Sequence, residues 1–223
     1  MTIRIAPSIL SSNYARIGEA VRLAEEAGAD LIHVDIMDGH FVPNLTFGPG
    51  LVASLKKTTR LPLDVHLMVE RPRSFIPQFL EAGADWISFH IEASPHPDRD
   101  LALVKEAGRK AGLALKPRTS VHLLKRILPR LDQVMIMSVN PGWGGQMFIE
   151  ATHRKIRCLR RLVQEAGLEV AIEVDGGVGL DNMEGLIRDG ADVLIAGAAI
   201  YRDADPRGVI ARMRSIARKF EST

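Results

Sequence analysis

One short pattern recurs along the chain and constrains its fold more than any other feature. The letters EAGAD end at Asp30 and again at Asp85, RDGAD ends at Asp192, and looser versions surround Gly112 and Gly167. Each glycine follows a helical pattern and precedes an apolar run rich in β-branched residues, as expected of a helix C-terminal cap that leads into a strand. These glycines recur near multiples of roughly 27 residues, so the 223-residue chain holds about eight such units.

Eight strand–helix units predict an α/β fold, the closed (βα)8 barrel of the TIM type. The expected strands comprise residues 3–10, 31–37, 63–68, 86–90, 113–116, 133–137, 169–175 and 193–196. A helix is expected after each strand, for example over residues 14–27, 74–82, 98–111, 151–166 and 206–220. No linker divides the chain, so we expect one barrel domain over residues 1–223. The alternative is an open doubly wound sheet, but its Gly-x-Gly-x-x-Gly turn does not follow the first strand.

Charge and cysteine content narrow the class of protein. The formal net charge is +2 and no Lys/Arg tract stands out, so neither nucleic acid nor a membrane is expected as a partner. Cys158 is the only cysteine, which excludes an internal disulfide and fits a reducing compartment. The N-terminus enters a strand without an apolar leader, and no segment approaches the length of a membrane span. We expect a cytoplasmic protein, and apolar residues on the barrel helices favour a homo-oligomer.

Polar side chains near the ends of three expected strands indicate a metal site. His33 and Asp35 share one face of their strand, because side chains at i and i+2 project together. His66 comes from the next strand and Asp175 from the seventh. Catalysis in such barrels occurs at the C-terminal ends of the strands. Two histidines and two carboxylates there suit Zn²⁺, Fe²⁺, Mn²⁺ or Co²⁺, whereas His33 and Asp35 alone also fit a structural core pair.

Two further acidic residues lie on the same strands as the expected ligands. Asp64 precedes His66 by two positions, and Glu173 precedes Asp175 by two. We expect both side chains to point toward the helix layer, where salt bridges satisfy them.

Glycine-rich stretches after the last three strands predict a phosphate site. They lie at residues 138–146, 175–179 and 196–199. Glycines let backbone N–H groups approach an anion closely, and loops seven and eight of such barrels commonly hold a phosphate. The loop with Trp143 is expected to close over the substrate as a lid. Methionines 37, 68 and 137 at strand ends are either core filling or an apolar wall around an anionic intermediate.

A metal between two carboxylates, with a phosphate cradle at a distance, predicts proton transfer on a phosphorylated hydroxyketone. Asp35 and Asp175 lie on different strands, so one can remove a proton while the other donates one to the opposite face of the same carbon. Their pKa values are expected to be coupled. No organic cofactor is needed.

Residues 32–46 and 134–146 closely resemble the signatures of ribulose-phosphate 3-epimerases. These stretches read IHVDIMDGHFVPNLT and VMIMSVNPGWGGQ, and shorter matches surround Ser8, His66 and Asp175. The resemblance runs from Ile5 to about Arg207. It implies a ribulose-phosphate-binding barrel that interconverts D-ribulose 5-phosphate and D-xylulose 5-phosphate with one divalent metal ion.

Carried over by position, the resemblance assigns roles to individual residues. It implies that His33, Asp35, His66 and Asp175 bind the metal and that Asp35 and Asp175 are the two acid/bases. It also implies substrate contacts by Ser8 and His66. The phosphate end would comprise Gly142, Trp143, Gly144, Gly145, Gly176, Gly177, Gly197 and Ala198.

Two departures from the family pattern leave the substrate open. Ala198 stands where the family usually has serine, and Trp143 where it usually has phenylalanine. A 3-epimerase of another ketose phosphate, such as D-allulose 6-phosphate, is therefore an alternative. A metal-free decarboxylase or synthase is a weaker one, because the Asp-x-Lys-x-x-Asp pattern is absent around Asp35. A non-catalytic phosphosugar-binding barrel would have no evident use for four ligands.

Overall fold

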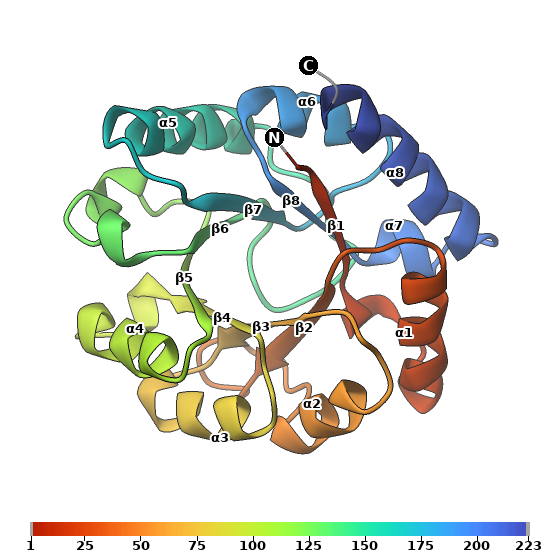
Figure 1. Ribbon diagram of the computed structural model, residues 1–223, viewed down its shortest axis with the longest axis horizontal. Coiled ribbons are helices and arrows are strands. Elements are labelled where there is room, and N and C mark those ends of the chain that lie inside the picture. The colour runs from red at the N-terminus through yellow and green to blue at the C-terminus, as the bar shows by residue number, and fades with distance from the viewer. Residues whose placement is uncertain (1, 222–223) are drawn as a thin grey trace.

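The computed structural model describes residues 2–221 as strands and helices that alternate around one barrel (Figure 1). The strands are β1 (Arg4–Pro7), β2 (Ile32–Met37), β3 (Leu63–Met68), β4 (Trp86–His90), β5 (Lys110–Leu115), β6 (Gln133–Met137), β7 (Ala171–Asp175) and β8 (Val193–Ala196). The α-helices are α1 (Ile17–Glu26), α2 (Pro49–Lys56), α3 (Ile76–Glu81), α4 (Pro97–Glu106), α5 (Ala151–Glu165), α6 (Met183–Asp189), α7 (Ala198–Tyr201) and α8 (Pro206–Glu221). Short 3₁₀ turns are η1 (Ile9–Ser11), η2 (Tyr14–Arg16), η3 (Pro72–Ser74), η4 (Ile91–Ala93), η5 (Val121–Leu124) and η6 (Leu128–Arg130).

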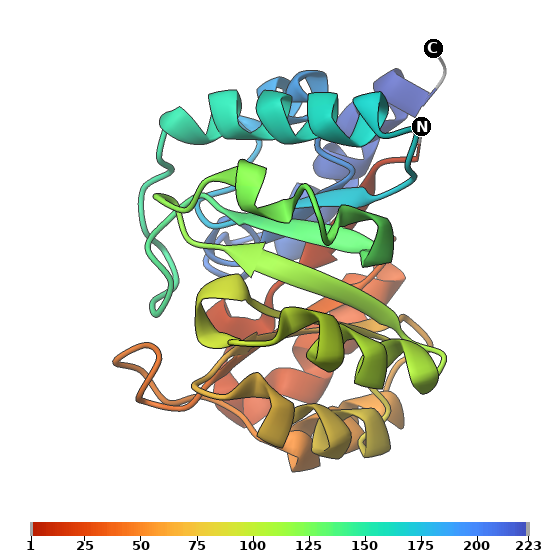
Figure 2. The same ribbon diagram turned by 90° about the vertical axis from the view of Figure 1, so that its left-hand side faces the viewer.

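All neighbouring strands run parallel, in the order β1-β8-β7-β6-β5-β4-β3-β2. A parallel bridge between Ser8 and His33 links β1 to β2 and completes the ring. The predicted (βα)8 barrel is therefore confirmed, and the open doubly wound sheet is wrong. Figure 2 shows the β2–α2 and β6–α5 connections projecting from the same end of the barrel.

The strands are apolar in long runs because they are covered on both sides. Val34, Val65 and Leu67 point outward and are fully buried against the helices. Helices such as α1 supply the matching apolar stripe, in which Val21 and Ala24 are fully buried. This packing fixes the strand ends from which the functional side chains project. Among the described residues, no helix is both long and apolar enough to cross a bilayer.

The segment around β5 differs from the sequence prediction. The helix expected over residues 98–111 ends at Glu106, and the turn that follows contains Gly108 with φ 70°. Gly112 lies inside β5, where a Cβ atom would overlap the side chain of Gln133 on β6. Close packing, rather than a helix cap, therefore requires this glycine. The connection from β5 to β6 contains only the 3₁₀ turns η5 and η6, so the helix expected there is also wrong.

Candidate active site

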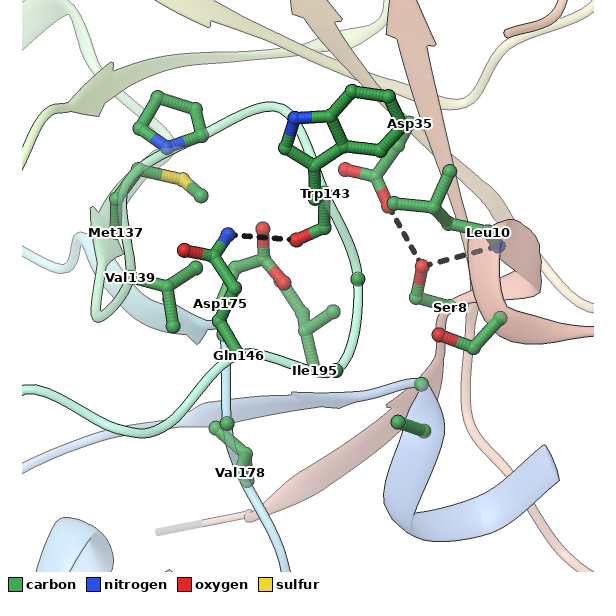
Figure 3. Close-up of a pocket in the computed structure, with 18 of the residues that line it drawn as sticks. Ser8, Leu10, Asp35, Met137, Val139, Trp143, Gln146, Asp175, Val178 and Ile195 are labelled. Carbon is green, nitrogen blue, oxygen red and sulfur yellow. Dashed lines mark hydrogen bonds between the residues drawn. The ribbon is translucent and has the colours of Figure 1, made fainter. Parts of the chain in front are cut away.

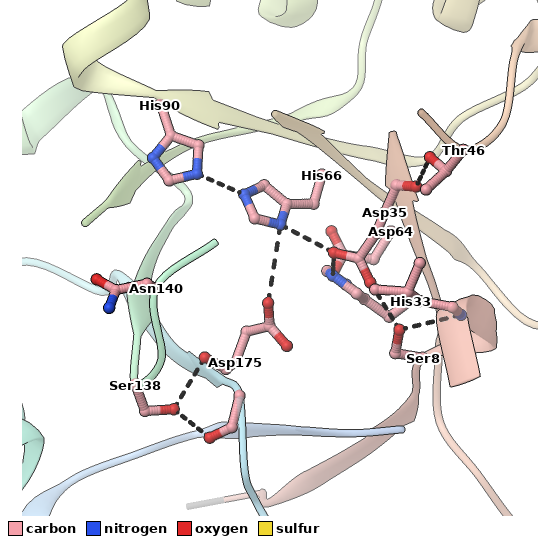
Figure 4. A network of polar contacts seen from close by, with 12 residues as sticks. Ser8, His33, Asp35, Thr46, Asp64, His66, His90, Ser138, Asn140 and Asp175 are labelled. Carbon is pink, nitrogen blue, oxygen red and sulfur yellow. Dashed lines mark hydrogen bonds and ion pairs between the residues drawn. The ribbon is translucent and has the colours of Figure 1, made fainter. Parts of the chain in front are cut away.

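Four side chains from three strands converge at the C-terminal end of the barrel (Figure 4). Asp35 Oδ1 lies 3.3 Å from Nε2 of His33 and 3.2 Å from Nδ1 of His66. Asp175 Oδ2, from β7, lies 3.9 Å from the same Nδ1 of His66. One nitrogen or oxygen atom from each of the four residues lies within 4.8 Å of the others. The fold thus brings together the four residues that the sequence pattern singled out.

The donor set fits a divalent transition metal. Asp64 Oδ2 lies 2.6 Å from Nδ1 of His33, which leaves the Nε2 atom of His33 facing Asp35. On the other side, Nε2 of His66 lies 3.0 Å from Nε2 of His90, which leaves Nδ1 of His66 facing both aspartates. Histidine ligands of metals typically hold their second ring nitrogen in such a contact. Two imidazoles and two carboxylates, fully or largely buried, match the borderline-soft cations of the first transition row.

Asp64 and Glu173 do not point toward the helix layer, and that expectation is wrong. Asp64 contacts the inward-facing His33, and Glu173 is fully buried with neither carboxylate oxygen hydrogen-bonded. The reason is the period of a strand: residues 64 and 66 share one face, as do residues 173 and 175. Burial, followed by the charge of Asp64, raises the pKa of Glu173 well above its usual range.

The environment pushes the pKa values of the two candidate acid/bases in opposite directions. Burial alone would raise the pKa of Asp35, but the imidazoles of His33 and His66 hold it well below its usual range. For Asp175, burial and the nearby charge of Asp35 raise the pKa to about 6. Burial would lower the pKa of His33, but Asp35 and Asp64 raise it well above its usual value. The two carboxyl groups therefore differ in proton affinity although they face the same imidazole.

A cavity of about 230 Å³ opens above this cluster (Figure 3). Asp35 and Asp175 lie at its inner end, and Ser8 donates a hydrogen bond of 2.7 Å from Oγ to Asp35 Oδ2. The predicted methionines and glycine-rich segments also line it: Met37, Met68, Met137, Gly142, Trp143, Gly144, Gly145, Gly176, Gly177, Gly197 and Ala198. His33 and His66 are fully buried and do not line the cavity.

Glycine is required where the loops of the cavity meet. Gly177 has φ 63°, and a Cβ atom on it would lie 2.7 Å from the backbone nitrogen of Phe148. Within residues 2–221, the backbone N–H groups of Gly177, Ala198 and Ala199 donate no hydrogen bond. Free backbone N–H groups on two adjacent loops are the donors that an anion such as phosphate binds.

The β6–α5 loop is held at both of its ends. Asn44, in the β2–α2 loop, donates a 2.9 Å hydrogen bond from Nδ2 to the carbonyl oxygen of Gly142. The Gln146 amide donates to the carbonyl oxygens of Asn140, at 2.7 Å, and Trp143, at 2.8 Å. The Trp143 side chain remains 57% exposed at the cavity mouth. An exposed indole on an anchored loop is suited to cover a bound molecule.

Comparison with known proteins agrees with this architecture. The profile described as the ribulose-phosphate 3 epimerase family matches residues 4–201. A "Ribulose-phosphate 3-epimerase" of Bacillus subtilis is 47% identical over 95% of this chain and 98% of its own length. One of Escherichia coli K12 is 49% identical over 95% of this chain and 94% of its own. The chain belongs to the ribulose-phosphate 3-epimerase family. It is an enzyme, an isomerase that acts on carbohydrates, and the family resemblance of its motifs is confirmed.

Solved structures of lower identity share the fold of this epimerase family member. A crystal structure of KGPDC from Streptococcus mutans has a TM-score of 0.75 at 15% identity and covers 98% of this chain and 99% of its own. A 3-hexulose-6-phosphate synthase from Salmonella typhimurium has a TM-score of 0.75 at 17% identity, over 97% and 99%. Another structure of the Streptococcus mutans protein, in complex with a phosphosugar ligand, has a TM-score of 0.73 at 16% identity, over 97% and 98%.

Sequence reasoning missed one histidine of this epimerase site. His90, at the end of β4, is fully buried between His66 and the carboxylate of Glu92, whose Oε2 lies 3.2 Å from its Nδ1. Burial lowers the pKa of His90 to about 4. A usable signal existed, because His90 ends a strand with the same inward parity as the ligands. Its neighbours on that face, Trp86 and Ser88, carry no comparable chemistry, so the pattern stood out less.

Proposed function

We propose that this enzyme interconverts D-ribulose 5-phosphate and D-xylulose 5-phosphate by proton transfer at C3 between two bases, Asp35 and Asp175. One observation carries the proposal. The two carboxylates reach the same imidazole of His66 from β2 and β7 and line one end of a cavity whose other end is rich in glycine. Two carboxylates with different pKa values on opposite sides of one carbon invert its configuration.

Each part of the cavity has a role in this proposal. One carboxylate removes the C3 proton, and the other donates a proton to the opposite face. Ser8, which donates to Asp35, orients that carboxylate and contacts the substrate. Met37, Met68 and Met137 form an apolar wall that excludes water from the reacting carbon. The glycine-rich loops bind the phosphate through their backbone N–H groups, and Trp143 covers the sugar.

His33, Asp35, His66 and Asp175 are the residues that would hold a divalent metal ion, Zn²⁺, Fe²⁺, Mn²⁺ or Co²⁺. A bound cation would supply Lewis-acid stabilisation of the negative charge that develops on the substrate oxygens. The activity of named relatives and the phosphosugar complex of a structural neighbour support a ketose phosphate as substrate. The proposal places the enzyme in the pentose phosphate pathway.

The first experiment is incubation of the metal-loaded protein with D-ribulose 5-phosphate in D₂O, followed by NMR at C3. We expect deuterium at C3 together with the appearance of D-xylulose 5-phosphate. No exchange, with bound metal confirmed, contradicts the substrate assignment. The same assay with D-allulose 6-phosphate then tests the alternative 3-epimerase.

Two further predictions concern the whole protein. Sedimentation velocity measures whether the chain forms the expected homo-oligomer. Fractionation of the source cells measures the expected cytoplasmic location. Both stay predictions.

A further inference from the structure

The charges that line the cavity are poorly matched to a phosphorylated substrate. Among the described residues that line it, the ionisable side chains are Asp35, Asp175 and Asp181, and none is Lys or Arg. A sugar phosphate is close to a dianion at neutral pH, because the second pKa of such groups is about 6. Backbone N–H groups carry partial charges only. A full positive charge at the phosphate end would offset the repulsion.

Arg202 lies next to this end of the cavity. It directly follows α7, the helix that begins at Ala198 on the cavity wall. Its Nη1 atom is so near Gly145 of the β6–α5 loop that a Cβ atom on Gly145 would lie 2.6 Å from it. Gly145 itself lines the cavity and has φ 77°. The guanidinium group therefore lies where the lid loop meets the glycine-rich wall.

The Arg202 side chain has no partner in the part of the chain that the structure describes. Neither a hydrogen bond nor an ion pair is found for its guanidinium group within residues 2–221. Other arginines of the C-terminal half of the chain are paired: Arg207 with Glu26, and Arg160 with Asp192. An unpaired guanidinium beside an acid-lined cavity is available to an anionic ligand.

We propose that Arg202 is a substrate-binding residue that donates hydrogen bonds from its guanidinium group to the phosphate of the ketose phosphate. The planar fork of arginine matches two phosphate oxygens at once. Because the same group lies against Gly145, binding of the phosphate and seating of the lid loop involve one contact. The inference rests on the proposed function and deepens it, since it names a residue that selects phosphorylated over free ketoses.

The test compares three variants: Arg202→Gln, Arg202→Lys and Arg207→Gln as a matched control. Arg207 is also an exposed arginine of the same region, but it pairs with Glu26 away from the cavity. We measure the Kd of inorganic phosphate by calorimetry, and KM and kcat with D-ribulose 5-phosphate. For Arg202→Gln we expect KM and the phosphate Kd to rise about tenfold, with kcat changed less than about twofold. Arg202→Lys is expected to recover part of the loss, and Arg207→Gln to match the wild type.

Salt provides a second readout. The phosphate affinity of the wild type should fall more steeply between low and high ionic strength than that of Arg202→Gln, because one screened charge pair has been removed. An unchanged phosphate Kd in Arg202→Gln, or a fall in kcat alone, overturns the inference and assigns Arg202 to propping the loop. Phosphate binding does not require turnover. Absence of C3 exchange in the wild type would therefore contradict the proposed function without deciding this one.

Discussion

Asp64 Oδ2 lies 2.6 Å from Nδ1 of His33, at the bottom of the polar cluster and away from the cavity. This contact fixes which nitrogen of His33 faces the site. It also leaves the other carboxylate oxygen of Asp64 buried without a hydrogen bond. A carboxylate behind a histidine orients the ring and raises its basicity as a ligand. Asp64 thus acts on the metal site through His33.

The first prediction concerns Asp64→Asn. We expect the affinity for Zn²⁺ or Mn²⁺ to fall about 10- to 100-fold, because the amide holds the imidazole less firmly. Competition with a chelator measures it. Asp100→Asn is the matched control: Asp100 is also buried and hydrogen-bonded, to Ser94 and Arg73, but lies on α4. Equal metal affinity in both variants would contradict the role of Asp64.

The second prediction concerns Asp175→Asn. Turnover should fall by about 10²- to 10⁴-fold, since a positioned acid/base contributes that much. In D₂O the variant should still exchange the C3 proton of one epimer, the one whose proton faces Asp35. Metal content is measured in the same sample, and Asp181→Asn, on the cavity rim, is the control. Retention of more than about a tenth of the activity would rule out the two-base assignment.

Removal of the metal should lower stability without unfolding the barrel. The core around the strands is apolar and does not depend on the ligands. Dialysis against a chelator should therefore leave the far-UV circular dichroism unchanged while it abolishes activity. Adding metal back at about 100 times its Kd should stabilise the fold by about 2.7 kcal/mol, seen as a rise in Tm. A Tm independent of metal concentration would contradict a specific site.

Glu92 should contribute to stability at neutral pH and not in acid. Burial opposes its charge, but contacts from His90, Thr119 and the backbone nitrogen of Lys116 lower its pKa to about 2, from an ordinary 4.5. The folded state therefore binds this proton less tightly than the unfolded chain. The stabilisation is present above about pH 4.5 and is lost as the pH falls toward about 2. Urea unfolding should show wild type more stable than Glu92→Gln at about pH 6, with the difference vanishing near about pH 2.

Gly112→Ala tests the packing inside the barrel. The new methyl group would overlap Gln133, so we expect a loss of about 1–3 kcal/mol in the free energy of unfolding. Gly50→Ala, where nothing lies within 4 Å, should instead leave stability unchanged or raise it by up to about 1 kcal/mol. Urea titrations measure both. Similar values for the two variants would show that Gly112 is not needed for packing.

Much of the site could be predicted because it depends on local periodicity. His33 and Asp35 share a face by the period of a strand, and the barrel places all strand ends together. The same rule, applied correctly, would have turned Asp64 and Glu173 inward. The glycines at positions 28, 83, 167 and 190 have positive φ values, as predicted for helix caps.

The sequence by itself therefore determined the barrel, the convergence of four ligands and the glycine-rich phosphate end. Only the tertiary structure decided the contacts between elements distant in the chain: Asp64 behind His33, His90 beside His66, Gly112 against Gln133, and Arg202 next to Gly145. The physical reason is register. Which side chains meet across a closed barrel depends on how its strands are staggered, and that stagger results from packing of the whole ring rather than from any one segment.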